Sequence, residues 1–243
     1  IIKKKSNLFY LVIFIFILSE ALIFISGDRS AFFFINLSAI FIMLFSHNLF
    51  KLRLVTLIFS LILVMIISFI NPTAKERVFN QTINQIIGTE ERPKGEKGLF
   101  IFTKTHTHHY ITAYRMYLDN KIIGVGVKNF RKLCKNKKYE VSKLSCSSHP
   151  HNTYIQILSE TGIIGFLFLM TALIYFCINV VKHLILKING RHHFTDFEIC
   201  VLSGVAIYLW PFAPTGNVFS NWLNIAMILN FPFLIWRLNS NKF

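Results

Sequence analysis

Apolar residues run along this chain in six long blocks, which several short polar segments and one long polar segment separate. Most blocks approach the roughly 17–20 residues with which an α-helix crosses a lipid bilayer. The fifth block is short, and it also suits a re-entrant hairpin with the sixth. The pattern predicts an all-α polytopic membrane protein with about six transmembrane helices. The blocks cover residues 8–25, 30–46, 54–70, 163–181, 199–213 and 218–236.

Basic residues on the short flanks predict how these helices are oriented. Ten lysines and arginines lie on the flanks of one side, whereas the short flanks on the other side contain only Arg29. Because cytoplasmic loops are enriched in Lys and Arg, we expect the side with ten to face the cytoplasm. Three regions follow: helices in 1–70, one large periplasmic loop in 71–152, and further helices in 153–243.

The excess of basic residues has a different explanation in a membrane protein than in a soluble protein. The chain has 26 Lys and Arg against 11 Asp and Glu. In a soluble protein this balance indicates nucleic acid, but in a membrane protein topology explains it first, so we expect no nucleic-acid partner. The large loop itself has fifteen basic and six acidic residues. It is either a solvated loop near anionic lipid headgroups or a site for a polyanionic substrate.

The large loop also contains Cys134 and Cys146. A periplasmic location permits disulfides, so these two either form a bridge that closes a small basic loop or remain free thiols. The chain starts with Ile1, not Met, and has no cleavable signal pattern. We therefore expect the C-terminal part of a longer protein, with N-terminal helices missing.

The turn between the first two blocks reads Gly27-Asp28-Arg29-Ser30. Asp28 is suited to cap the second helix, and Gly27 permits a tight turn. Arg29 either extends to lipid headgroups or binds an anionic ligand.

A second polar feature extends from Tyr110 to Phe130. Its first half has the spacing of an imperfect amphipathic helix, which suits a membrane surface and would contain Arg115. Gly124 and Gly126 follow. They either form an ordinary turn or let the backbone approach phosphates.

The most informative segment is 149–165. Thr153 and Gln156 fit a capping box, which predicts a helix that starts near residue 153. His151 then lies just ahead of a helix N-terminus, whose dipole disfavours the imidazolium form. A neutral histidine beside solvent can act as a general base; alternatively, it merely ends a loop. Gly162 and Gly165 suit a bend or a close helix contact.

This segment resembles the signature of the O-antigen ligase and O-antigen polymerase-like membrane protein family. The turn at Gly27, the Arg115 segment and Pro214-Thr215-Gly216 are similar to other parts of that family, in the same order. Asp28 stands where the family more usually has a small residue. The matching residues of the segment are His149, His151, Asn152, Tyr154, Gln156, Leu158, Glu160, Gly162 and Gly165.

The resemblance implies a GT-C-like glycosyltransferase of the bacterial inner membrane with its active site facing the periplasm. Its members transfer a glycan from an undecaprenyl-pyrophosphate carrier, without metal or other cofactor, to lipid A–core (ligases) or to a carrier-linked glycan (polymerases). Arg29 and Arg115 would bind the pyrophosphate, and His151 would assist attack by the acceptor hydroxyl. Membrane lipids are further partners. The residues with supporting roles would be His149, Asn152, Glu160, Gly124 and Gly126.

Two other functions compete with this interpretation. A transporter for a small ion or solute usually has ionisable residues near the bilayer centre. The apolar blocks are nearly free of them, and Glu20, the clearest intramembrane acid, lies within about two turns of the outer end of the first block, which favours surface chemistry. A zinc site is conceivable because five histidines fall in the large loop, although their spacing fits no closed zinc pattern. Those histidines are His106, His108, His109, His149 and His151.

Overall fold

The computed structural model describes residues 2–87, 101–191, 193–221, 225, 229–230 and 232. Within these ranges the chain forms helices joined by loops, and no strand occurs. The predicted all-α class is therefore confirmed for this part of the chain. The helices are α1 (Ile2–Ser26), α2 (Arg29–Phe45), α3 (Phe50–Ile70), α4 (Pro72–Lys75), the π-helix η1 (Glu76–Asn80), α5 (Gln81–Ile87), α6 (Lys104–Asp119), α7 (Phe130–Leu133), α8 (Thr153–Ile188) and α9 (Asp196–Tyr208).

Three helices in the described ranges are long and apolar enough to cross a membrane: Leu8–Ser26 of α1, all of α3, and α8. Helix α2 is apolar but has only 17 residues. Helix α9 ends at Tyr208 and residues 209–220 are non-helical, so the fifth apolar block is helical only as far as Tyr208. Most of block 218–236 lies outside the described residues. Six spans thus remain a prediction, of which three meet the length requirement.

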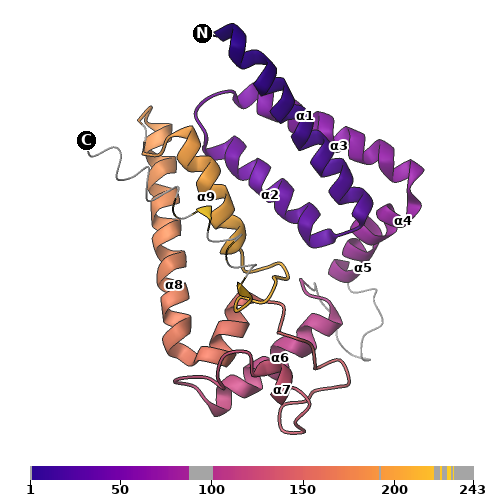
Figure 1. Cartoon of the computed structure of the whole chain (residues 1–243), viewed down its shortest axis with the longest axis vertical. Helices are drawn as coiled ribbons and strands as arrows, with labels where there is room; N and C mark the ends of the chain where they lie inside the picture. The colour runs from indigo at the N-terminus through magenta and orange to yellow at the C-terminus, as the bar shows by residue number, and fades with distance from the viewer. Residues whose placement is uncertain are drawn as a thin grey trace.

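The helices form two groups that meet along α2 and α9 (Figure 1). Helices α1, α2 and α3 make one group, and α8 and α9 make the other. Phe41 of α2 packs between them against Phe194, Ile199 and Leu202. Helices α6 and α7 lie against the start of α8, at the lower end of the view in Figure 1. The large polar segment is therefore built onto one end of the helical groups.

The short helices after α3 pack back onto the first group. Ala74 of α4 and Val78 of η1 are buried with Phe24 of α1 and Val64 of α3. This apolar cluster fixes α5 beside the turn between α1 and α2, which contains Arg29.

Helix α8 is broken at Gly162, whose backbone has φ 67° and ψ −164°. The expected bend is thus present. The loop 121–126 fills the break with four backbone hydrogen bonds. Val125 and Gly126 donate to the carbonyls of Ser159 (2.9 Å) and Glu160 (3.0 Å). The amides of Ile163 and Ile164 donate to the carbonyls of Lys121 (2.8 Å) and Ile122 (3.4 Å). Backbone groups that the break would leave unpaired in a buried place are therefore satisfied.

Gly124 and Gly162 face each other at this junction. A Cβ atom on Gly124 would lie 2.4 Å from the carbonyl carbon of Glu160, and one on Gly162 would lie 2.3 Å from the carbonyl oxygen of Ile122. Both glycines also have positive φ. The close approach made by Gly124 is therefore to the backbone of α8.

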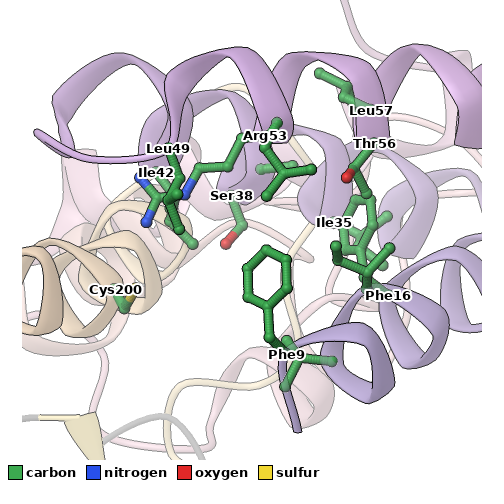
Figure 2. A pocket seen from close by; sticks show the side chains of 14 residues that line it. Phe9, Phe16, Ile35, Ser38, Ile42, Leu49, Arg53, Thr56, Leu57 and Cys200 are labelled. Carbon is green, nitrogen blue, oxygen red and sulfur yellow. The ribbon is translucent and has the colours of Figure 1, made fainter. Parts of the chain in front are cut away.

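A mostly apolar pocket of about 470 Å³ lies between α1, α2 and α3 (Figure 2). Phe9 and Phe16 of α1 and Leu57 of α3 line it. Arg53, the charged residue of the lining, is occupied by Asp196 at 3.9 Å. The lining is mainly aliphatic and aromatic, which suits an apolar occupant better than a reacting sugar or phosphate.

Candidate functional site

Four histidine rings meet where α6 lies beside the start of α8, and we call them the histidine cluster: His106, His109, His149 and His151. The ring centroid of His151 lies 4.0 Å from that of His149, 5.4 Å from that of His106 and 5.6 Å from that of His109. His106 and His109 share one face of α6 because they are three residues apart. His151 is therefore the centre of the cluster.

His151 occupies the last residue but one before α8, with a left-handed backbone at φ 62°. Its carbonyl accepts from the amide of Thr215 at 2.9 Å and from the Tyr110 hydroxyl at 3.5 Å. Its Nε2 lies 3.0 Å from the Oγ of Ser147. A non-glycine residue rarely adopts this backbone, so the contacts around it must hold it in place.

His149 is held more completely than His151. Its Nε2 lies 3.2 Å from the carbonyl oxygen of Thr215, and a carbonyl can only accept, so this nitrogen must carry the proton. The Nδ1 then accepts from the hydroxyl of Ser148 at 2.8 Å. Both ring nitrogens are thus engaged, which suits a supporting role.

Burial and mutual repulsion keep the cluster neutral. Burial lowers the pKa of His151 to about 4, and the nearby His149, His106 and His109 add to the effect. Burial also lowers the pKa of His106 to about 4, with contributions from His109 and from the positive charge of Arg29. Burial is likewise the main cause that lowers the pKa of His109 and His149. The expectation of a neutral His151 is supported, but burial rather than the helix dipole is the leading cause.

The start of α8 at Thr153 agrees with the prediction, but its cap does not. Asn152 is the capping residue, since its Oδ1 accepts from the amides of Tyr154 (3.0 Å) and Ile155 (3.2 Å). The predicted capping box of Thr153 and Gln156 is wrong. Thr153 is buried with its hydroxyl 3.1 Å from that of Thr215, where it links two segments instead.

Asn152 and Gln156, at the start of α8, form hydrogen bonds with the segment that follows α9. Asn152 donates from Nδ2 to the carbonyl of Pro211 at 2.9 Å. Gln156 donates to Oδ1 of Asn217 at 2.8 Å and accepts from the amide of Val218 at 3.2 Å. Segments 149–156 and 211–218, far apart in sequence, are therefore held together beside His151.

Glu160 is a buried carboxylate with two defined partners. Its Oε1 accepts from the amide of Phe130 at 3.0 Å, and its Oε2 accepts from Gln156 at 3.2 Å. Phe130 begins α7 and is fully buried with Ala113 and Met116 of α6. Glu160 thus connects α8 to the core of residues 101–152, which contain α6 and α7 and which we call the loop domain.

The turn at Gly27 has the expected form. Gly27 has φ 71°, and Asp28 caps α2 by accepting from the amide of Ala31 at 3.0 Å. Arg29 donates from Nη1 to Oε1 of Gln85 at 3.3 Å. Its charge acts on His106, as noted above, so Arg29 lies within electrostatic reach of the histidine cluster.

Arg115 and Gly126 lie on the loop domain. Helix α6 spans Lys104–Asp119, so the amphipathic helix predicted in the first half of 110–130 is present and begins earlier than Tyr110. Arg115 lies in α6, is exposed, and donates from Nη1 to the carbonyl of Glu140 at 2.8 Å. None of the hydrogen bonds or ring contacts in the described residues joins it to the histidine cluster. Gly126 has φ 92° beside Asn129, whose side chain donates to the carbonyl of Val125 at 2.8 Å.

Cys134 and Cys146 form a disulfide with a Cα–Cα distance of 5.1 Å, which decides between the two alternatives for this pair. Cys134 is buried with Phe130 and Tyr139. No group of three His, Cys, Asp or Glu side chains within the described ranges is arranged to hold a metal ion.

Sequence reasoning placed His106 and His109 only in a zinc hypothesis and did not assign Ser147. The spacing of three residues between the two histidines is a signal that they share a helix face. Nothing in the sequence, however, indicates that this face meets His151.

A model of the O-antigen ligase family matches residues 12–170 of the chain. The chain belongs to the O-antigen ligase family. The matched range includes the Gly27 turn, α6, the histidine cluster and the break at Gly162. No curated protein and no solved structure matched. Membership in this family indicates an O-antigen ligase- or polymerase-type protein of polysaccharide assembly, whose partners in general are lipid-linked glycans and lipid A–core.

Proposed function

We propose that this protein transfers a glycan from an undecaprenyl-pyrophosphate carrier to a hydroxyl of an acceptor sugar. The acceptor is lipid A–core in a ligase or a carrier-linked glycan in a polymerase. The observation that carries the proposal is the convergence of three neutral histidines on His151, with Arg29 within electrostatic reach. The proposed setting is the bacterial inner membrane, with the site on the periplasmic face.

The site has the groups that this reaction needs. The acceptor oxygen bonds to the anomeric carbon, the bond from that carbon to the pyrophosphate oxygen breaks, and the hydroxyl proton passes to His151. The carrier pyrophosphate leaves with the bonding electrons. Arg29 would stabilise its negative charge through paired N–H contacts.

The pKa of His151 near 4 means that the free site holds an imidazole ready to accept a proton at neutral pH. It is a weak base in that state. A bound pyrophosphate brings negative charge, which raises the pKa of a nearby imidazole. The donor would thus strengthen the base when the reaction requires it.

Arg115 has a secondary place in the proposal. One of its N–H groups is used by the carbonyl of Glu140, and a guanidinium has five, so donors remain for phosphate or sugar oxygens. Gly124, Glu160 and Asn152 would act through the scaffold: Gly124 and Glu160 join the loop domain to α8, and Asn152 caps α8 and holds the segment after α9.

Glu20, the clearest intramembrane acid, is buried between α1 and α3 and accepts a hydrogen bond from Ser60. This contact joins α1 to α3 through Oε2, while Oε1 is buried without a hydrogen-bond partner among the described residues.

The test is reconstitution of the full chain in liposomes with a carrier-linked glycan and an acceptor. We expect glycan transfer without added metal or nucleotide sugar, and no solute flux. Flux of an ion or solute without transfer would contradict the proposal and favour the transporter.

A further inference from the structure

The loop 121–127 exposes a small apolar tip beside the break in α8. Ile122 is 65% exposed, Ile123 is 71% exposed and Val127 is 49% exposed. Lys121 and Lys128 flank this tip and are also exposed. Neighbouring isoleucines so open to solvent are unfavourable in water, and lysines beside an apolar surface are typical of membrane interfaces.

Hydrogen bonds fix how deep this tip lies. The carbonyls of Lys121 and Ile122 accept from the amides of Ile163 and Ile164, as described above. Those two residues begin the apolar stretch 163–181 of α8, a helix long enough to span a membrane. The tip is therefore held beside the first residues of that apolar stretch.

We propose that Ile122 and Ile123 insert into the outer part of the lipid bilayer and anchor the loop domain there. Lys121 and Lys128 would extend to the headgroups. The occupant of this surface is membrane lipid itself. The anchor would hold α6, and with it His106 and His109, at a set height above the bilayer. It does not depend on the reaction proposed above.

The test uses Ile123→Cys in the full chain, in a background in which the free Cys177 and Cys200 are Ser and the disulfide is kept. Bimane is attached and the protein is placed in liposomes. Lys137→Cys, on the exposed basic loop, is the matched control.

We expect bimane at position 123 to be quenched by lipid with a spin label high on its acyl chain and to be protected from aqueous iodide. The control should show the reverse. Quenching of position 123 by iodide but not by the labelled lipid would overturn the proposal. Protection from both quenchers would also overturn it, because another protein segment would then cover the tip.

A separate observation concerns the hydroxyl of Ser147, which touches three polar groups. Its Oγ lies 2.6 Å from the carbonyl oxygen of His149, to which only donation is possible. It accepts from the amide of His149 at 3.3 Å. Its single proton is thus used, so towards Nε2 of His151 at 3.0 Å it can only accept.

We infer that Ser147 is a positioning residue that fixes His151 in the tautomer with the proton on Nε2. The Nδ1 of His151 then has the free lone pair, and it is the atom that would receive the proton of the acceptor hydroxyl. This inference rests on the proposed role of His151 as a base. Its structural half can be tested without any reaction.

The test is nitrogen NMR of the full chain in lipid nanodiscs with ¹⁵N-labelled histidine, with the His151 signal assigned by its loss in His151→Gln. We expect an unprotonated Nδ1 in the native protein, a mixed tautomer in Ser147→Ala, and recovery in Ser147→Thr. Ser142→Ala, which removes a hydroxyl 2.6 Å from Nδ1 of His108, is the control and should leave the His151 signal unchanged.

Glycan transfer provides the second readout. A neutral hydrogen bond contributes about 0.5–1.5 kcal/mol, so Ser147→Ala should lower kcat about 2- to 10-fold with KM unchanged. A protonated Nδ1 in the native protein would overturn the inference even if transfer is normal. Absence of transfer in the native protein, with Nδ1 unprotonated, would instead count against the proposed function.

Discussion

Gly124→Ala tests whether the loop domain is joined to α8 through direct backbone contact. The new Cβ would lie 2.4 Å from the carbonyl carbon of Glu160, 2.5 Å from the amide of Thr161 and 2.6 Å from that of Gly162. These neighbours are backbone atoms, so no side-chain rotation can relieve the clash. The loop or the helix must move, and the hydrogen bonds of Val125 and Gly126 to α8 must lengthen.

The chain contains a matched control for the magnitude. Gly190 has the same φ of +69° as Gly124, but a Cβ there would meet nothing within 4 Å. Gly190→Ala should therefore cost only the left-handed backbone strain, about 1–2 kcal/mol. Gly124→Ala should add an overpacking cost of about 1–3 kcal/mol.

The measurement is heat-induced unfolding of both variants in lipid nanodiscs, followed by helical circular dichroism and by glycan transfer after heating. We expect Gly124→Ala to unfold at a clearly lower temperature than Gly190→Ala, and to lose transfer even below that temperature. Equal midpoints for the two variants would show that the close approach of loop and helix is not needed, which would refute the reasoning.

Other predictions concern charge and covalent structure. Folding lowers the pKa of each histidine in the cluster below 6.5, and to about 4 for two of them. Between about pH 4 and 6.5 the unfolded chain therefore binds more protons than the folded chain. The free energy of unfolding should therefore fall as the pH drops from about 6.5 to 4, and it should be constant above about pH 6.5. A melting temperature that does not change between pH 6.5 and 4 would contradict the lowered pKa values. Replacing both Cys134 and Cys146 by Ser should cost about 2–4 kcal/mol, and an unchanged melting temperature would argue against a structural disulfide. Arg29→Ala should strongly reduce transfer and Arg29→Lys should restore little, because paired contacts to phosphate need guanidinium geometry; full activity with Lys would reduce Arg29 to general electrostatics.

Turns and helix ends that depend on residues close in sequence could be predicted from the sequence. Asp28 caps α2 and Gly27 makes the turn, as their residue types indicate. Helix α8 begins at Thr153 and bends at Gly162, as expected. In the turn and the helix starts the groups involved lie within four positions of one another, so the sequence contains the whole interaction, whereas the bend at Gly162 also depends on the distant loop 121–126.

Features that depend on distant segments could not be predicted in this way. Thr153 fits a capping box, but Thr215 engages its hydroxyl, and Asn152 becomes the cap. The meeting of α6 with His151 depends on the packing of the loop domain against α8. The sequence left open whether Cys134 and Cys146 form a bridge or stay free thiols, because only the fold brings them together.

The most direct test of the account is glycan transfer by His151→Gln beside His151→Ala and His149→Ala, each normalised to the amount of membrane-inserted protein. Gln keeps an N–H that can reach Ser147 but has no basic nitrogen, so it separates positioning from proton transfer. If His151 is the base, both His151 variants should lose at least about 10²-fold in rate, and His149→Ala should lose less. Near-normal transfer by His151→Gln would contradict the central claim and leave His151 as a positioning residue.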